Sequence, residues 1–199
     1  MSEGRQGVSE GRQGVSGSGQ GRDEDGKRRR RVPKPLDPAS LDELALGYVA
    51  RFATSRAKLL TYLKRKLRER GWAAEEPPGF EALAAKLIGL GFIDDRAFAE
   101  VKAGTLTRRG LGVRRVRAAL GAAGIGADDQ SAALAGAAGQ GWTAALRFAE
   151  RRRLGPWAAE LAGPQASRKA LAAMLRGGHD FAVARRIVTT PPGEVPEPP

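Results

Sequence analysis

The sequence predicts an all-α protein, an elongated tandem array of three-helix units with a disordered tail at each end. Three observations predict this fold. Apolar residues recur at helical spacing through residues 41–190, no segment alternates apolar and polar residues as a strand does, and helix-ending glycines recur at a regular interval. Units this small bury little core of their own, so we expect each to pack on its neighbours.

The first predicted unit is residues 40–92. Ser40 and Glu43 have the spacing of a capping box, in which two side chains satisfy free N–H groups at a helix start. We expect a second helix over about residues 55–71 and a third over about residues 80–91, because a glycine after the last apolar residue commonly ends a helix. The apolar residues of the first helix are Leu41, Leu44, Ala45, Tyr48, Val49 and Phe52.

The three-helix pattern returns twice, in residues 93–139 and in residues 140–189, which are the second and third predicted units. The glycines that end the middle helices are spaced by 53 and 54 residues. This spacing favours true repetition over the accidental similarity that any helical protein shows. These glycines are Gly71, Gly124 and Gly178, and the first helix of the second unit is marked by Phe98, Val101 and Leu106.

Both ends of the chain lack the bulky apolar residues of a core. Residues 2–8 and 9–15 repeat the same seven letters, SEGRQGV, and a basic run at residues 27–31 follows. We interpret residues 1–39 as a disordered basic arm, which either touches a polyanion non-specifically or is a solubilising extension. Proline cannot continue a helix, so residues 190–199 are predicted to be a disordered Pro-rich tail.

Composition excludes several classes of chemistry. The 199 residues include one histidine and no cysteine, which removes disulfides, thiolate metal sites and cysteine nucleophiles and disfavours a histidine-based triad. No G-x-x-x-x-G-K-[ST] phosphate loop is present, so ATP turnover is expected of a partner. We therefore expect no enzymatic activity, no cofactor and no metal. No membrane-length apolar run and no secretory leader are visible, which predicts a cytoplasmic protein without membrane contact.

Two pairs of adjacent aspartates, Asp94-Asp95 and Asp128-Asp129, could suggest a two-carboxylate catalytic site. Adjacent helical side chains point about 100° apart and do not converge. Capping explains the pairs better, and we expect Asp128 to be the N-cap of its helix. His179 directly follows a helix end, where packing or capping is a better explanation than pH sensing.

Basic side chains form the candidate site. The net charge is +12; the first 40 residues carry 9 basic and 6 acidic side chains, and the other 159 carry 25 and 16. Stacked units would align the basic residues along one face, which suits a long acidic or polyanionic partner such as DNA or an acidic protein filament. The alternative is that exposed helix faces are simply charged. The candidates are Arg56, Lys58, Arg65, Arg108, Arg109, Arg114, Arg115, Arg117, Arg151, Arg152, Arg185 and Arg186.

The most distinctive segment is Gly91-Phe92-Ile93-Asp94-Asp95, followed by Phe98-Ala99. Upstream stands Ala45-Leu46-x-Tyr48-Val49-Ala50-Arg51, and downstream stands Arg109-Gly110-x-Gly112-x-Arg114-Arg115-Val116. In this order and spacing, the segments resemble the RecX family of bacterial regulators of the RecA recombinase, over roughly residues 41–189. The chain departs from the family at Val113, where a proline is expected, and at His179, where an aromatic or aliphatic residue is usual.

The resemblance implies a non-enzymatic modulator, mainly an inhibitor, of RecA. Proteins of that family bind the RecA–DNA filament along its groove and restrain its growth, ATP hydrolysis, strand exchange and stimulation of repressor cleavage, in DNA repair, recombination and the SOS response. The implied partners are the RecA filament and, through phosphates, DNA. No long heptad seam is present, so we expect a monomer. The alternatives are an independent basic nucleic-acid-binding protein and a helical-repeat adaptor.

Overall fold

A computed structural model describes residues 34–194 and 196–198 of the chain. Within these residues every regular element is a helix, which confirms the predicted all-α class. Most of the predicted arm 1–39 lies outside the described residues. The elements are α1 (Pro38–Arg51), α2 (Arg56–Arg70), α3 (Phe80–Gly89), α4 (Asp95–Arg108), α5 (Val113–Gly121), α6 (Ala127–Gly139), α7 (Gly141–Arg152), the short 3-10 helix η1 (Gly155–Trp157), α8 (Pro164–Arg176) and α9 (Phe181–Thr189).

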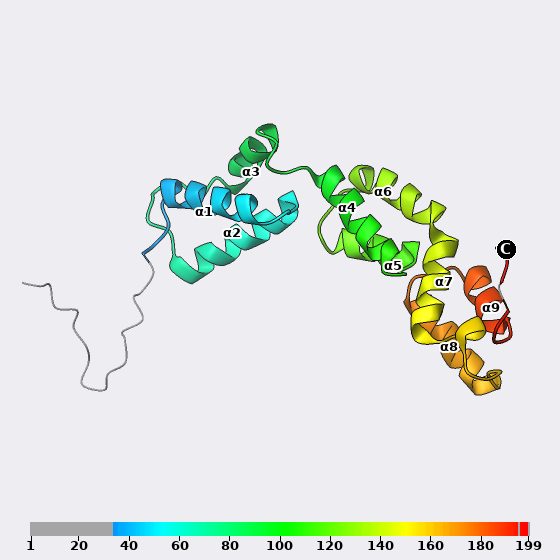
Figure 1. Cartoon of the computed structure of the whole chain (residues 1–199). Helices are drawn as coiled ribbons and strands as arrows, with labels where there is room; N and C mark the ends of the chain where they lie inside the picture. Colours follow the sequence, from blue (N-terminus) through cyan, green and yellow to red (C-terminus); the bar gives the residue numbers. More distant parts are fainter. Residues whose placement is uncertain (1–33, 195, 199) are drawn as a thin grey trace, which may run out of the picture. The chain divides into compact units, whose positions relative to one another are not determined.

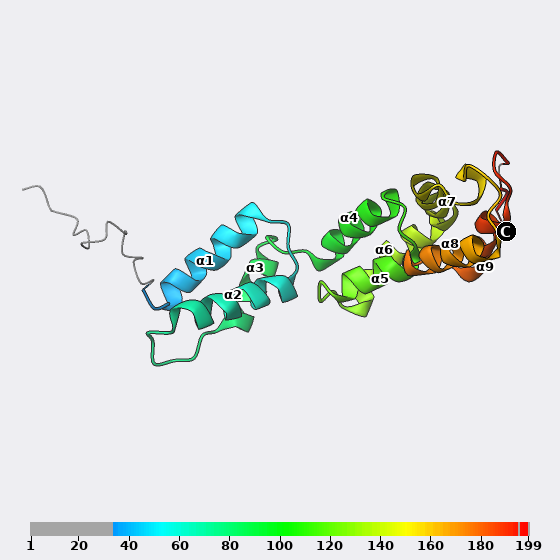
Figure 2. The same ribbon diagram turned by 90° about the horizontal axis from the view of Figure 1, so that it is seen from below.

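The helices pack in three consecutive groups of three, α1–α3, α4–α6 and α7–α9 (Figures 1 and 2). Each group has its own apolar core. Leucines dominate the first core, small alanines let α4 and α6 approach closely in the second, and Met174 and Ile187 fill the third. The tandem three-helix arrangement is therefore confirmed, and the unit boundaries 40–92, 93–139 and 140–189 stay a prediction.

Helix α1 begins earlier than the sequence indicates. Its N-cap is Asp37, whose Oδ1 accepts a 2.8 Å hydrogen bond from the backbone N–H of Ser40. The Ser40 hydroxyl accepts in return from the Asp37 N–H, at 2.9 Å. The prediction that Ser40 starts the helix with Glu43 is wrong, because Pro38 is a favourable first helical residue and Asp37 supplies the cap. The bond from the Ser40 N–H lowers the pKa of the Asp37 carboxyl.

Other helix ends test the capping predictions directly. Ser55 and Asp94 are the N-caps of α2 and α4, in line with the helix starts predicted there, and the side chain of each accepts a bond from the backbone N–H three residues on. The prediction for Asp128 is wrong, because Gly126 is the N-cap of α6 and Asp128 lies in the first turn. An acidic residue stabilises that turn through the positive end of the helix dipole without capping it.

Neighbouring groups meet through one kind of joint. The start of the middle helix in one group packs on the turn that follows the middle helix of the next group. At the first joint, the Ser55 hydroxyl donates to the carbonyl of Ala123 at 2.6 Å. At the second, the N–H of Gly112 donates to Gly177 at 2.9 Å and that of Arg114 to Gly178 at 3.2 Å. At this second joint Gly112 and Gly178 allow backbone to approach backbone, because an added Cβ on either one would overlap the main chain of the facing segment.

In the first group, the segment around Leu36 packs on the turn after α2. The Leu36 N–H donates to the carbonyl of Gly71 at 3.0 Å, and the Leu36 carbonyl accepts from Ala73 at 2.8 Å. Gly71 and Gly178 hold corresponding places, so the N–H of Leu36 stands where the N–H of Arg114 does in the second joint. The Leu36 side chain is fully buried in the first core. Residues 34–39, assigned to the arm from sequence, thus contribute to the core and to the start of α1.

The described part of the Pro-rich segment, residues 190–194 and 196–198, contains no helix. The N–H of Gly193 donates to the carbonyl of Pro156 at 2.9 Å, which holds this part of the chain against η1. Among the residues that the structure describes, no helix is long and apolar enough to cross a membrane.

Candidate functional site

Every arginine that the sequence suggested as a binding residue lies exposed on the surface, and Lys58 is half-buried. Three of the arginines lie beside carboxylates. The guanidinium of Arg56 lies 2.6 Å from Glu81, that of Arg65 lies 3.8 Å from Glu69, and that of Arg114 lies 3.5 Å from Asp180. Exposed pairs of this kind contribute at most about 1 kcal/mol each, so they reduce the local charge more than they stabilise the fold.

The remaining candidate arginines have no carboxylate within 4.0 Å among the residues that the structure describes. Their charge is therefore open to a partner. They are Arg108, Arg109, Arg115, Arg117, Arg151, Arg152, Arg185 and Arg186.

Arginines from two helix groups meet where the loop after α4 packs on α7. The Arg151 guanidinium donates a 3.0 Å hydrogen bond to the carbonyl of Arg109, 42 residues earlier in the chain. The approach depends on Gly110, where an added Cβ would lie 2.9 Å from the backbone nitrogen of Phe148. The guanidinium of Arg152 lies over the Phe148 ring at 5.2 Å from its centroid, which fixes that side chain beside the others.

The arginines of α5 divide between two directions. Arg114 and Arg117, three residues apart, line a pocket of about 420 Å³ together with Trp142 and Val183. Arg115 lies outside that pocket, because successive helical residues point about 100° apart. The structure therefore joins two of the three α5 arginines at one place and does not bring all three together.

His179 also lines this pocket and is 3 % exposed. Its Nε2 lies 3.1 Å from the carbonyl of Gly110, and a carbonyl only accepts, so Nε2 carries the proton. The ring packs edge-on against Phe148 with centroids 5.1 Å apart. Burial lowers the pKa of His179 from its usual 6.5, and the Gly110 bond opposes this only in part. The neutral ring is a structural part of the second joint, in line with the packing role expected for it.

A family model described as "RecX, second three-helix domain" matches residues 94–134, which span α4, α5 and the first half of α6. The Regulatory protein RecX of Myxococcus xanthus (strain DK1622) is 29% identical over 178 residues, which cover 85% of this chain and 95% of that protein. Over most of its length the chain is therefore similar to a RecX protein. The resemblance inferred from the sequence motifs is thereby confirmed.

Two solved RecX structures share the fold. RecX from Lactobacillus salivarius superposes with a TM-score of 0.54 and 20% identity, covering 75% of this chain and 93% of that one. A second structure, of a regulatory protein RecX, superposes with a TM-score of 0.56 and 23% identity. The match covers 75% of this chain and 70% of the chain in that structure. The tandem helical groups described above are thus the RecX fold.

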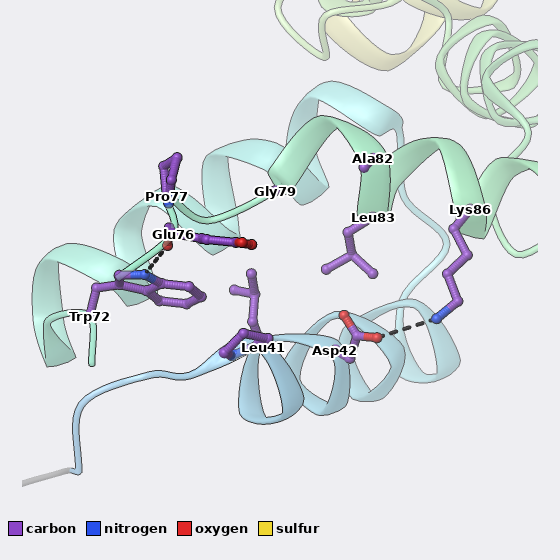
Figure 3. A pocket seen from close by; sticks show the side chains of 10 residues that line it. Leu41, Asp42, Trp72, Glu76, Pro77, Gly79, Ala82, Leu83 and Lys86 are labelled. Atoms are coloured by element: carbon purple, nitrogen blue, oxygen red, sulfur yellow. Dashed lines mark hydrogen bonds and ion pairs between the residues drawn. The ribbon is translucent and has the colours of Figure 1, made fainter. Parts of the chain in front are cut away.

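The chain also has a pocket of about 330 Å³ between α1, α3 and the loop before α3, shown in Figure 3. Several of its polar groups pair with one another. The Lys86 ammonium lies 3.3 Å from Asp42, and the indole N–H of Trp72 donates to the carbonyl of Glu76 at 2.7 Å. These contacts join α3 to α1 and hold the Trp72 ring against the loop before α3.

In the described residues no three carboxylates or histidines converge on a point that would hold a metal ion. The aromatic ring of Tyr62 stacks on Tyr48 with ring centroids 4.2 Å apart, and the Arg65 guanidinium lies 5.7 Å from the Tyr62 centroid. Tyr62 is therefore a packing residue whose ring also lies close to the side-chain charges of Arg65 and Lys66.

Sequence reasoning missed the residues that complete the pocket lined by Arg114 and Arg117, which are Trp142, Asp180 and Val183. They come from α7, from α9 and from the turn before it, far from α5 along the sequence. No periodic pattern links segments that meet only through a joint between units. The sole sequence signal was the glycine pair before His179, which marks a close backbone approach.

The buried histidine predicts a pH dependence of stability. Its folded pKa is depressed, so its contribution to the free energy of unfolding is complete above its usual value of 6.5 and is lost as the pH falls through the folded value. We expect urea titrations to show lower stability at about pH 5 than at about pH 7.5. The charged groups around the same pocket are Arg114, Arg117 and Asp180.

The matched variant is His179→Gln, whose amide replaces the Nε2 donor and does not titrate. It should lose clearly less stability than the unchanged chain over the same pH interval. Asp37 and Glu69, whose pKa values are lowered by hydrogen bonds, titrate below this interval and do not interfere. Equal slopes in the two proteins would mean that another group controls the acid sensitivity.

Proposed function

We propose that this RecX-like protein regulates RecA, mainly as an inhibitor, without catalysing a reaction. It binds the RecA–DNA filament and restrains filament growth, ATP hydrolysis, strand exchange and coprotease activity. The observation that carries the proposal is the hydrogen bond from the Arg151 guanidinium to the backbone carbonyl of Arg109, because it joins two units that both present arginines with no carboxylate partner among the described residues. Guanidinium groups bind both phosphates and carboxylates in bidentate fashion, and a DNA-bound protein filament presents both.

The tandem architecture supports a filament as the partner. We propose three units, residues 40–92, 93–139 and 140–189, in a cytoplasmic monomer. Each unit makes a weak contact, and the contacts reinforce one another because the bound units hold the next one at high effective concentration. A filament of repeated subunits offers such successive sites, whereas a small soluble ligand offers one.

The direct test is the ATPase activity of RecA on single-stranded DNA with the protein added below the RecA concentration. We expect inhibition at substoichiometric amounts, since one bound chain blocks growth over many subunits. A folded protein that leaves the RecA ATPase unchanged would count against the proposal.

The second test addresses the contact face. We expect the change of Arg114, Arg115 and Arg117 to alanine to raise the concentration for half-inhibition by roughly tenfold or more, since each lost charge-assisted bond weakens binding. The matched control changes Arg147, Arg168 and Lys169 to alanine, three exposed cations outside the candidate set, with the same loss of charge. Thermal unfolding should be similar in both. If the two variants inhibit equally well, the α5 arginines do not form the contact.

The alternative function, binding to nucleic acid without RecA, is favoured by the positive surplus outside the first 40 residues. Salt separates the two. Binding to duplex DNA alone should weaken steeply, with log affinity falling by about 0.9 per neutralised phosphate for each decade of salt. Binding to RecA through protein contacts should persist at moderate salt and on RecA assembled without DNA.

A further inference from the structure

An apolar hollow lies where the loop between α1 and α2 faces the start of α4. Its volume is about 410 Å³, which is within the range of about 300–1,000 Å³ found for ligand clefts. Phe92, which is 49 % exposed, and Val101, which is 69 % exposed, line it. Side chains of this size are seldom left in water next to each other without a partner. The family resemblance and the arginine clusters leave this surface without a role.

Two lysines border the hollow, and both are held in place. The ammonium of Lys58 lies 5.0 Å from the centroid of the Phe98 ring, and that of Lys102 lies 5.8 Å from the same ring. Cation–π contacts of this kind fix the charges at the rim without neutralising them. Neither lysine has a carboxylate partner within 4.0 Å in the described part of the chain. The hollow thus combines an apolar floor with a cationic edge.

The nearby acidic groups are engaged in structure. The Oδ1 of Asp94 accepts from the N–H of Ala97 at 2.8 Å as the cap of α4. The Oδ1 of Asp95 accepts from the backbone N–H of Arg56 at 2.9 Å and so ties α4 to α2. These carboxylates hold the walls of the hollow together, while the lysines remain available to a ligand.

We propose that this hollow is the protein-binding contact of the chain and takes apolar side chains of a RecA segment flanked by carboxylates, whereas the arginines of the second joint contact DNA phosphates. The inference rests on the proposed function and divides its partners between two surfaces. A protein segment suits the hollow because both the apolar floor and the lysine rim are then used. A nucleobase suits it less, because the two lysines already lie against the Phe98 ring on which a base would stack.

The absence of cysteine from the sequence allows a direct test with single-cysteine probes. Val101→Cys places a benzophenone label in the hollow, and Ala118→Cys places the same label on the exposed surface of α5. After irradiation on RecA filaments with single-stranded DNA, we expect the label at position 101 to crosslink to RecA and the label at position 118 to crosslink to DNA. Crosslinking of position 101 to DNA instead would overturn the assignment.

A second measurement does not depend on the label. The double variant Phe92→Ser and Val101→Ser removes the apolar floor without changing the charge. We expect it to need at least about tenfold more protein for half-inhibition of the RecA ATPase, because truncating central apolar anchors commonly costs that much. Its affinity for single-stranded DNA alone should stay within about twofold, since no phosphate contact is lost.

Two controls complete the design. Leu161→Ser, at a leucine that is 73 % exposed in the third group, removes an apolar surface residue elsewhere and should inhibit normally. Val101→Ser alone leaves Phe92 intact and shows the effect if the double variant unfolds. Full inhibition by both Val101→Ser and the double variant rejects this inference alone. Failure of the unchanged chain to inhibit RecA rejects the proposed function as well.

Discussion

Replacing Gly178 with alanine should lower the free energy of unfolding by about 2–6 kcal/mol, a large share of the roughly 5–15 kcal/mol of a typical domain. Gly178 has φ +90°, where a side chain is strained, and its Cβ would overlap the backbone nitrogen of Arg115 and lie 2.9 Å from the carbonyl of Gly112. Backbone cannot move aside as a flexible side chain does. The second joint must therefore open or distort, and urea titration followed by circular dichroism measures the cost.

The matched control is Gly136→Ala, in the middle of α6. No atom outside its own helix lies within 4 Å of a Cβ there, so alanine should stabilise the helix by about 0.5–1 kcal/mol. If Gly178→Ala were as stable as the unchanged protein, the hydrogen bonds from α5 to the turn before α9 would not hold the second and third groups together. Loss of RecA inhibition with Gly178→Ala should accompany the loss of stability, since the arginines lie at this joint.

Leu36→Ala is expected to destabilise the protein by about 2–5 kcal/mol, the usual cost of a cavity left by a buried leucine. The Leu36 side chain is fully buried in the first core, although it lies in the segment that precedes α1. Its backbone bonds to Gly71 and Ala73 are available to alanine as well, so the effect measures the side chain alone. Equilibrium urea unfolding of the full chain provides the number.

The control for this variant is Leu161→Ala, at an exposed leucine, which should change the stability by less than about 0.5 kcal/mol. A result for Leu36→Ala close to that of the control would show that the segment before α1 contributes little to the first core. Within the predicted arm, the structural contribution would then start at Asp37, the N-cap of α1.

The helices were predictable because their cause is local. Ser55 and Gly71 bound α2 in the sequence and in the structure, since a serine that accepts a backbone bond and a glycine with φ +81° act within a few residues. Asp94 acts in the same local way at the start of α4. The predicted helix starts at Ser40 and Asp128 were wrong because a nearby residue is the N-cap instead. The N-cap preferences of such neighbouring residues are similar, so the sequence alone does not decide between them.

The joints and the surfaces were not predictable to the same degree. Ser55 and Ala123 meet through a backbone carbonyl, which every residue has, so nothing in the letters marks the pairing. Val101 fitted the apolar pattern expected of a core residue and is nevertheless exposed, because the neighbouring group leaves that face of α4 open. Exposure of the arginines followed from their helix positions, whereas the ion pair of Arg56 with Glu81 joins separate helices and has no sequence signal.

Both joints use hydrogen bonds to main-chain carbonyls beside glycines. Because every residue has a carbonyl, such a joint depends little on the side chains at the interface. A protein built in this way can therefore gain or lose a whole three-helix group while the remaining groups keep the same kind of joint. The Leu36 segment covers the turn after α2 with main-chain hydrogen bonds to Gly71 and Ala73, much as the start of α5 bonds to the turn after α8.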